Sequence, residues 1–171
     1  MIDMKKRQLG IIKIVLCAGL LVLAYIIQSM IFTYVRIFGL VPLILPIVST
    51  GVAVYGGRTA GGVSGLFAGM FTDLSLNQPL ALFTVILTFA GVGVGTVADT
   101  IFAKRFGTYF ISCAAVLAAC AIVQLFPLLI FEGVPAFLLF NTALRQTVYS
   151  LVFAIPIWFA IRKIISISDD Y

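Results

Sequence analysis

Long apolar runs fill most of the chain, and short polar or charged stretches separate them. A helix needs about 20 apolar residues to cross a bilayer, and several of the runs reach that length. Apolar residues follow one another instead of alternating with polar ones, which favours spanning helices over the strands of a transmembrane barrel. We therefore predict an all-α, polytopic membrane protein with about six transmembrane helices in a single domain, residues 1–171. The predicted spans are 14–34, 37–55, 59–74, 80–97, 109–130 and 137–161.

The composition supports a membrane protein. Hydrophobic residues make up 63% of the chain and charged residues only 10%. Soluble domains have about 45–50% apolar and about 25% charged residues. This small number of charged side chains cannot cover the surface of a soluble protein. The apolar runs must therefore face lipid or each other.

The positive charges lie at the ends of the apolar runs, where they act as orientation signals. With the N-terminus in the cytoplasm, the outer side of the six-helix arrangement holds Arg36, and Arg145 lies within a span. The inner side holds Lys5, Lys6, Arg7, Lys13, Arg58, Lys104, Arg105, Arg162 and Lys163. This asymmetry predicts that both termini are cytoplasmic. Because topology accounts for the net charge of +5, we expect no nucleic-acid partner.

The sequence contains no recognisable catalytic or metal-binding pattern. Histidine, the commonest metal ligand and general base, does not occur. Cys17, Cys113 and Cys120 all lie in apolar runs, where free cysteine usually packs as a small hydrophobic residue. We expect no enzymatic activity, no metal and no cofactor.

A glycine repeat marks the third apolar run. Gly57, Gly61, Gly65 and Gly69 recur every four residues, and Asp73 continues the spacing. On an α-helix these positions form one ridge that drifts by about 40° per step. Small residues on such a ridge let another helix approach closely. The ridge is interpreted either as packing against a neighbouring helix of the same chain or as a docking ridge for a partner's helix. The shorter glycine series 91, 93 and 95 makes the fourth helix a candidate neighbour.

Two charged residues lie at membrane depth, where an ionisable group is a functional candidate by default. Asp73 falls near the outer end of the third span, and Arg145 falls in the outer part of the sixth. Each can simply reach the interface, Arg145 by extending its side chain toward water. Alternatively they form an intramembrane ion pair, with Asn141 and Gln146 extending a polar cluster around it.

Two prolines lie in the second predicted span. Pro42 and Pro46 each remove a backbone donor, so we expect a helix kink in the outer part of this span. The kink is either a purely structural bend or the wall of a cavity.

Several of these features together resemble the MreD family of bacterial rod-shape-determining membrane proteins. The resemblance is carried by Gln28-Ser29 near the end of the first helix and by the proline-containing segment 39–45. The glycine-rich segment 61–74, which ends in Thr72-Asp73-Leu74, completes it. It spans roughly residues 20–100 of the chain.

The resemblance implies a non-enzymatic scaffold in the bacterial cytoplasmic membrane. Members of this family belong to the cell-elongation machinery and help control cell shape and lateral peptidoglycan synthesis. They bind MreC through its transmembrane helix. They are also associated with RodA and its transpeptidase partner, indirectly with MreB filaments, and with membrane lipid.

The alternative is the substrate-binding subunit of an energy-coupling-factor vitamin transporter. Those subunits are also small six-helix proteins, and their fold resembles that of MreD. A vitamin pocket needs several converging polar groups. The sequence offers few of them, namely Asp73, Asn77, Asn141, Arg145 and Gln146. Ala18, Gly19 and Ala24 also miss the spacing of the alanine ridge by which such subunits dock on their coupling protein.

Overall fold

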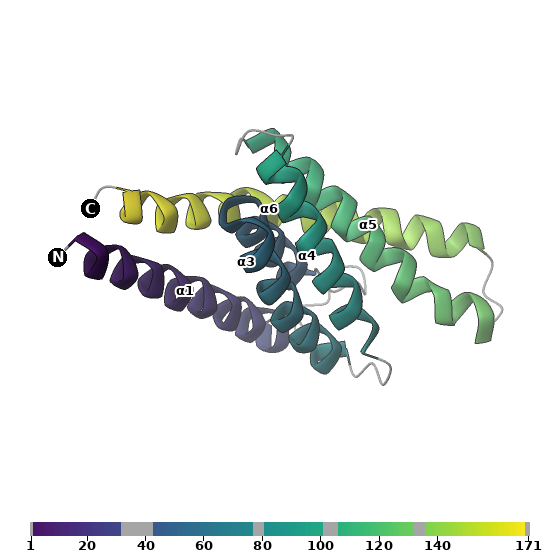
Figure 1. The fold of residues 1–171 in the computed structure, drawn as a ribbon. Coiled ribbons are helices and arrows are strands. Elements are labelled where there is room, and N and C mark those ends of the chain that lie inside the picture. The colour runs from purple at the N-terminus through teal and green to yellow at the C-terminus, as the bar shows by residue number, and fades with distance from the viewer. Residues whose placement is uncertain (1, 32–42, 77–80, 101–105, 132–135, 170–171) are drawn as a thin grey trace.

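The computed structural model describes residues 2–31, 43–76, 81–100, 106–131 and 136–169, and every element in these ranges is helical. This confirms the all-α class. The elements are α1 (Ile2–Ile26), a π-helical turn η1 (Ile27–Ile31), α3 (Ile44–Leu76), α4 (Leu82–Thr100), α5 (Phe106–Phe131) and α6 (Ala136–Asp169) (Figure 1).

Helix α3 consists of two arms that fold back on each other. The backbone leaves helical geometry at Gly57, with φ of 79° and ψ of −172°. The Ser64 hydroxyl donates to the carbonyl oxygen of Ser49 at 3.4 Å, which brings the two arms together on either side of the reversal. Residues 44–56 and 58–76 therefore form an α-helical hairpin. The reversal at Gly57 falls between the second and third predicted spans, and the bounds of these spans stay predictions.

Three helices are long and apolar enough to cross a membrane within the described ranges. They are Leu82–Thr100, Phe106–Gln124 and Phe140–Ile164, and Ile14–Met30 is a shorter apolar helix. This indicates a membrane protein.

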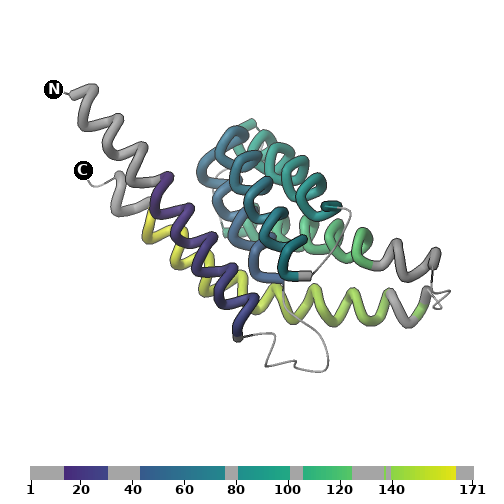
Figure 2. Tube along the Cα trace, turned by 90° about the horizontal axis from the view of Figure 1, so that it is seen from below, coloured from purple at the N-terminus to yellow at the C-terminus, as the bar shows by residue number. Residues whose placement is uncertain are grey.

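The α3 hairpin occupies the centre of the molecule and contacts all other helices, α4 most extensively. Helices α1 and α6 pack side by side, and the beginning of α1 and the end of α6 lie at the same end of the molecule (Figures 1 and 2). The indole nitrogen of Trp158 in α6 donates to the Tyr55 hydroxyl in the first arm at 2.8 Å. The core draws on all these helices and includes Leu21, Leu45, Ile47, Phe83, Leu117 and Ala154.

The first turn of α3 is capped by side chains from two other elements. Gln28 Oε1 in η1 accepts from the N–H groups of Ile44 at 3.0 Å and Leu45 at 3.1 Å. Ser150 Oγ in α6 accepts from the N–H of Leu43 at 3.2 Å. A helix leaves its first N–H groups without partners inside the helix, and these contacts satisfy them.

The expectation of a kink at Pro46 is wrong. Pro46 lies in the first turn of α3, where proline is favoured because its missing N–H would have no partner inside the helix. Among the described residues of α3, the helical geometry breaks at Gly57 instead. Pro42, the other residue of this prediction, lies outside the described residues.

Replacing Gly57 with alanine is expected to lower the free energy of unfolding by about 1–3 kcal/mol. The reason is that this combination of φ and ψ is open almost only to glycine. A Cβ atom there would also lie 2.7 Å from the Asp99 carboxylate. Thermal unfolding in detergent measures the effect. Gly19→Ala in α1 is the control, because a Cβ at Gly19 meets nothing within 4 Å. Equal midpoints for Gly57→Ala and wild type would contradict the prediction.

Candidate functional site

Helix α4 packs directly against the glycine ridge of the second α3 arm. A Cβ atom at Gly61 would overlap the carbonyl oxygen of Gly91, and one at Gly65 would overlap that of Leu87. A Cβ at Gly69 would overlap the backbone of Thr84. The two helices thus touch backbone to backbone. Of the two interpretations of the ridge, this geometry supports packing within the chain, and a partner's helix cannot reach these three glycines while α4 occupies them.

Gly57 has a different role from the other three glycines. It forms the reversal between the arms, so the helical ridge begins after it. Gly95 of α4 lies against this reversal, since a Cβ there would be 2.7 Å from the Cα of Arg58. The four-residue spacing at Gly57 therefore does not place it on a helix face with Gly61, Gly65 and Gly69.

Asp73 caps the N-terminus of α4. Its carboxylate accepts from the Phe83 N–H at 3.2 Å, the Thr84 N–H at 2.9 Å and the Thr84 hydroxyl at 2.6 Å. The side chain is 7% exposed. A carboxylate is favoured here because the free N–H groups and the helix dipole give a helix N-terminus positive character. Asp73 is therefore a buried helix cap, and it forms no ion pair with any residue in the described ranges.

Arg145 and Asn141 do not converge with Asp73. Both are exposed on α6. Within the described ranges, the Arg145 guanidinium makes neither an ion pair nor a hydrogen bond. The predicted Asp73–Arg145 ion pair is absent, because Asp73 directs its oxygens to α4. Gln146 is buried on another face of α6 and has an interaction partner there.

Sequence reasoning missed two further caps. Gln28, near the end of the first apolar run, caps α3. Asp99 Oδ2, near the end of α4, accepts from the Arg58 N–H at 3.3 Å, where the second α3 arm begins. The only sequence signal is a polar residue inside or beside an apolar run, and this does not identify the helix end that the residue caps.

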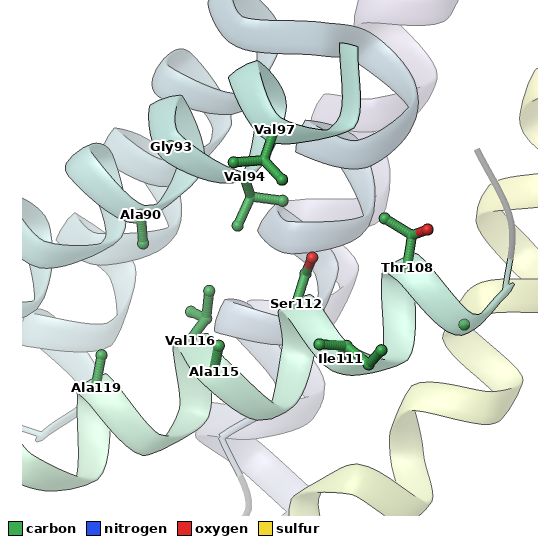
Figure 3. A pocket seen from close by; sticks show the side chains of 11 residues that line it. Ala90, Gly93, Val94, Val97, Thr108, Ile111, Ser112, Ala115, Val116 and Ala119 are labelled. Carbon is green, nitrogen blue, oxygen red and sulfur yellow. The ribbon is translucent and has the colours of Figure 1, made fainter. Parts of the chain in front are cut away.

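A hollow of about 640 Å³ lies between α4 and α5 (Figure 3). Ala90 and Val94 of α4 face Val116 and Ala119 of α5 across it. Its lining side chains are small or aliphatic apart from the hydroxyl groups of Thr108 and Ser112. Among the described residues, the lining consists of Ala90, Gly93, Val94, Val97, Gly107, Thr108, Ile111, Ser112, Ala115, Val116 and Ala119. Such a surface suits hydrocarbon and offers a polar solute little to bind.

The described side chains include no group of three or more Cys, Asp or Glu residues placed to hold a metal ion. Cys113 and Cys120 are buried as free thiols in α5, and Cys17 is a partly buried free thiol in α1.

Comparison of the chain with protein-family models, with characterised proteins and with solved structures finds no match.

Proposed function

We propose that this protein is a non-enzymatic membrane scaffold of the bacterial cell-elongation machinery, of the MreD type. In this role it binds MreC and helps control cell shape and lateral peptidoglycan synthesis. It acts together with RodA and its transpeptidase partner and, indirectly, with MreB filaments. It crosses the cytoplasmic membrane six times with both termini in the cytoplasm.

One observation favours a scaffold over a solute carrier: three of the buried polar side chains join one helix to another. Asp73 holds α4, and Gln28 and Ser150 hold α3. A solute pocket would need several polar groups aimed into one cavity. The α4–α5 hollow has an apolar lining, Arg145 and Asn141 are exposed on α6, and Asp73 is buried as the cap of α4. This arrangement disfavours the vitamin-transporter alternative.

The surface also suits association within the bilayer. Large apolar side chains are exposed on each of the three helices long enough to cross a membrane, for example Phe89 in α4, Ile122 in α5 and Val152 in α6. Lipid or helices of other membrane proteins can cover such faces.

The proposal predicts the partners of the tagged full-length protein. After mild detergent extraction from native membranes, we expect mass spectrometry to identify an MreC-like protein together with RodA and its transpeptidase. The control is an equally tagged membrane protein of similar size expressed at the same level. Recovery of paired ATPases with a membrane coupling subunit would overturn the proposal of a scaffold and establish the transporter alternative.

A further inference from the structure

A stripe of exposed side chains runs along α6 for the thickness of a membrane. Val148, Val152 and Phe159 are 57%, 62% and 61% exposed. The α6 stripe consists of Phe137, Asn141, Leu144, Val148, Val152, Ile155 and Phe159. At 1.5 Å per residue it is about 33 Å long, against about 30 Å for the hydrocarbon core of a bilayer. A complete spanning helix can therefore lie along it.

The opposite face of α6 is buried against the other helices. Gln146, Ser150, Ala154 and Ile161 are all buried, and Ser150 caps the N-terminus of α3. At about 100° per residue these positions lie on the far side of the helix from Val148. The stripe is thus the outward face of a helix whose orientation the core holds in place.

Two polar side chains interrupt this apolar face about one helical turn apart. Asn141 lies on the stripe, and Arg145 lies at its edge, about 60° around the helix from Val148. They are four residues apart, so they are neighbours on the helix surface. Arg145 is five positions inside the span Phe140–Ile164. A cation at membrane depth is expensive, and such residues usually pair with another group.

The candidate carboxylate within the chain is unavailable to Arg145, because Asp73 caps α4. In the described part of the molecule Arg145 also makes no other polar contact. Because no described carboxylate pairs with Arg145, charge complementarity favours a carboxylate supplied by a partner protein.

We propose that the α6 stripe docks a single spanning helix of the partner protein, and that this helix carries an Asp or Glu at the depth of Arg145. The carboxylate pairs with Arg145, Asn141 supplies a neighbouring hydrogen bond, and the apolar positions pack along the rest of the helix. This inference deepens the proposed function and rests on it, because it assigns the surface through which the scaffold holds its partner.

The first test maps the contact with a photo-crosslinking amino acid introduced one position at a time in full-length protein in native membranes. Val148 and Val152 report on the stripe. Phe89 in α4 and Ile122 in α5, which are 74% and 67% exposed, are matched controls. We expect both stripe positions to crosslink to a protein with one spanning helix that contains Asp or Glu. The controls are expected to crosslink to lipid.

The second test measures the charge pair. Arg145→Glu is expected to lower the recovery of the partner at least about tenfold, because it places like charges together at membrane depth. Lys163→Glu, the same reversal at an exposed position on the same helix, is expected to leave recovery unchanged. Replacing the partner's carboxylate by arginine should restore recovery with Arg145→Glu.

The outcomes separate the two proposals. If wild-type protein recovers no such partner, the proposed function fails. Suppose instead that wild type recovers the partner, but the α6 stripe crosslinks only to lipid and Arg145→Glu does not change the recovery. The proposed scaffold function is then retained, and the proposed docking surface is overturned. Arg145 then reaches the lipid headgroups with its long side chain.

Discussion

Replacement of Gly91 with alanine is expected to separate α4 from the second arm of α3 and to destabilise the protein by about 3 kcal/mol or more. A Cβ atom at this position would overlap the carbonyl oxygen of Gly61. The obstacle is backbone, which cannot rotate away as a side chain can, so the effect should reach or exceed the usual overpacking range of about 1–3 kcal/mol. The midpoint of thermal unfolding in detergent measures it.

Gly93 supplies the matched control, two residues further along the same helix. A Cβ atom there meets nothing within 4 Å. Alanine is a better helix former than glycine, so Gly93→Ala is expected to leave stability unchanged or raise it by up to about 1 kcal/mol. The two substitutions are chemically identical and differ in what lies beside them. Equal unfolding midpoints for the two variants would show that α4 does not pack on α3 as described.

Asp73→Ala is expected to destabilise the protein by about 2–4 kcal/mol. The change leaves the N–H groups of Phe83 and Thr84 without their acceptor at a buried helix end. A buried donor that loses its partner costs about 1–3 kcal/mol, and bonds to a charged group lie in the upper part of the usual range. Chemical or thermal unfolding of the purified protein measures the loss. Asp73→Asn keeps one acceptor oxygen and should fall between alanine and wild type.

Asp99→Ala is the matched control for this cap. Asp99 accepts one hydrogen bond at 3.3 Å and is exposed, so its removal should cost less than about 1 kcal/mol.

A charge swap tests the assignment of Asp73 as a cap. The double variant Asp73→Arg with Arg145→Asp should be no more stable than Asp73→Arg alone, because the two residues are not paired. Restoration of stability by the swap would favour an intramembrane ion pair over the cap. The same result would remove the unpaired cation from which the α6 docking surface is inferred.

The comparison of these residues shows how the bundle is held together. Gln28, Asp99 and Asp73 each cap a helix N-terminus that belongs to a different part of the chain. Caps are usually local, with a side chain bonding to N–H groups two or three residues further on. Here they connect separate elements, so each cap ties two helices together in addition to satisfying N–H groups. Apolar packing between membrane helices is not aided by water, which makes such polar ties valuable.

The sequence by itself determined the helical class, the apolar segments and the pairing of the two glycine-rich helices. These features depend on local properties. The length of an apolar run decides whether a helix can cross a bilayer, and small residues on one helix face permit close contact wherever that face is directed. The helical geometry breaks at Gly57, in the interval between the second and third predicted spans, but the bounds of these spans stay predictions. The number of crossings and the side on which the termini lie stay predictions.

Tertiary structure decided the role of each special residue. Gly57 and Gly61 belong to the same four-residue glycine repeat, yet Gly57 forms a turn and Gly61 packs against α4. The repeat does not reveal this difference, since only the folded chain shows where the helix is interrupted. Pro46 bends nothing, because α3 begins at Ile44. Asp73 and Arg145 lie at similar predicted depth, but helix rotation directs one to α4 and leaves the other exposed. Depth along a span can be read from sequence, whereas the direction in which a side chain faces depends on all the helices packed around it.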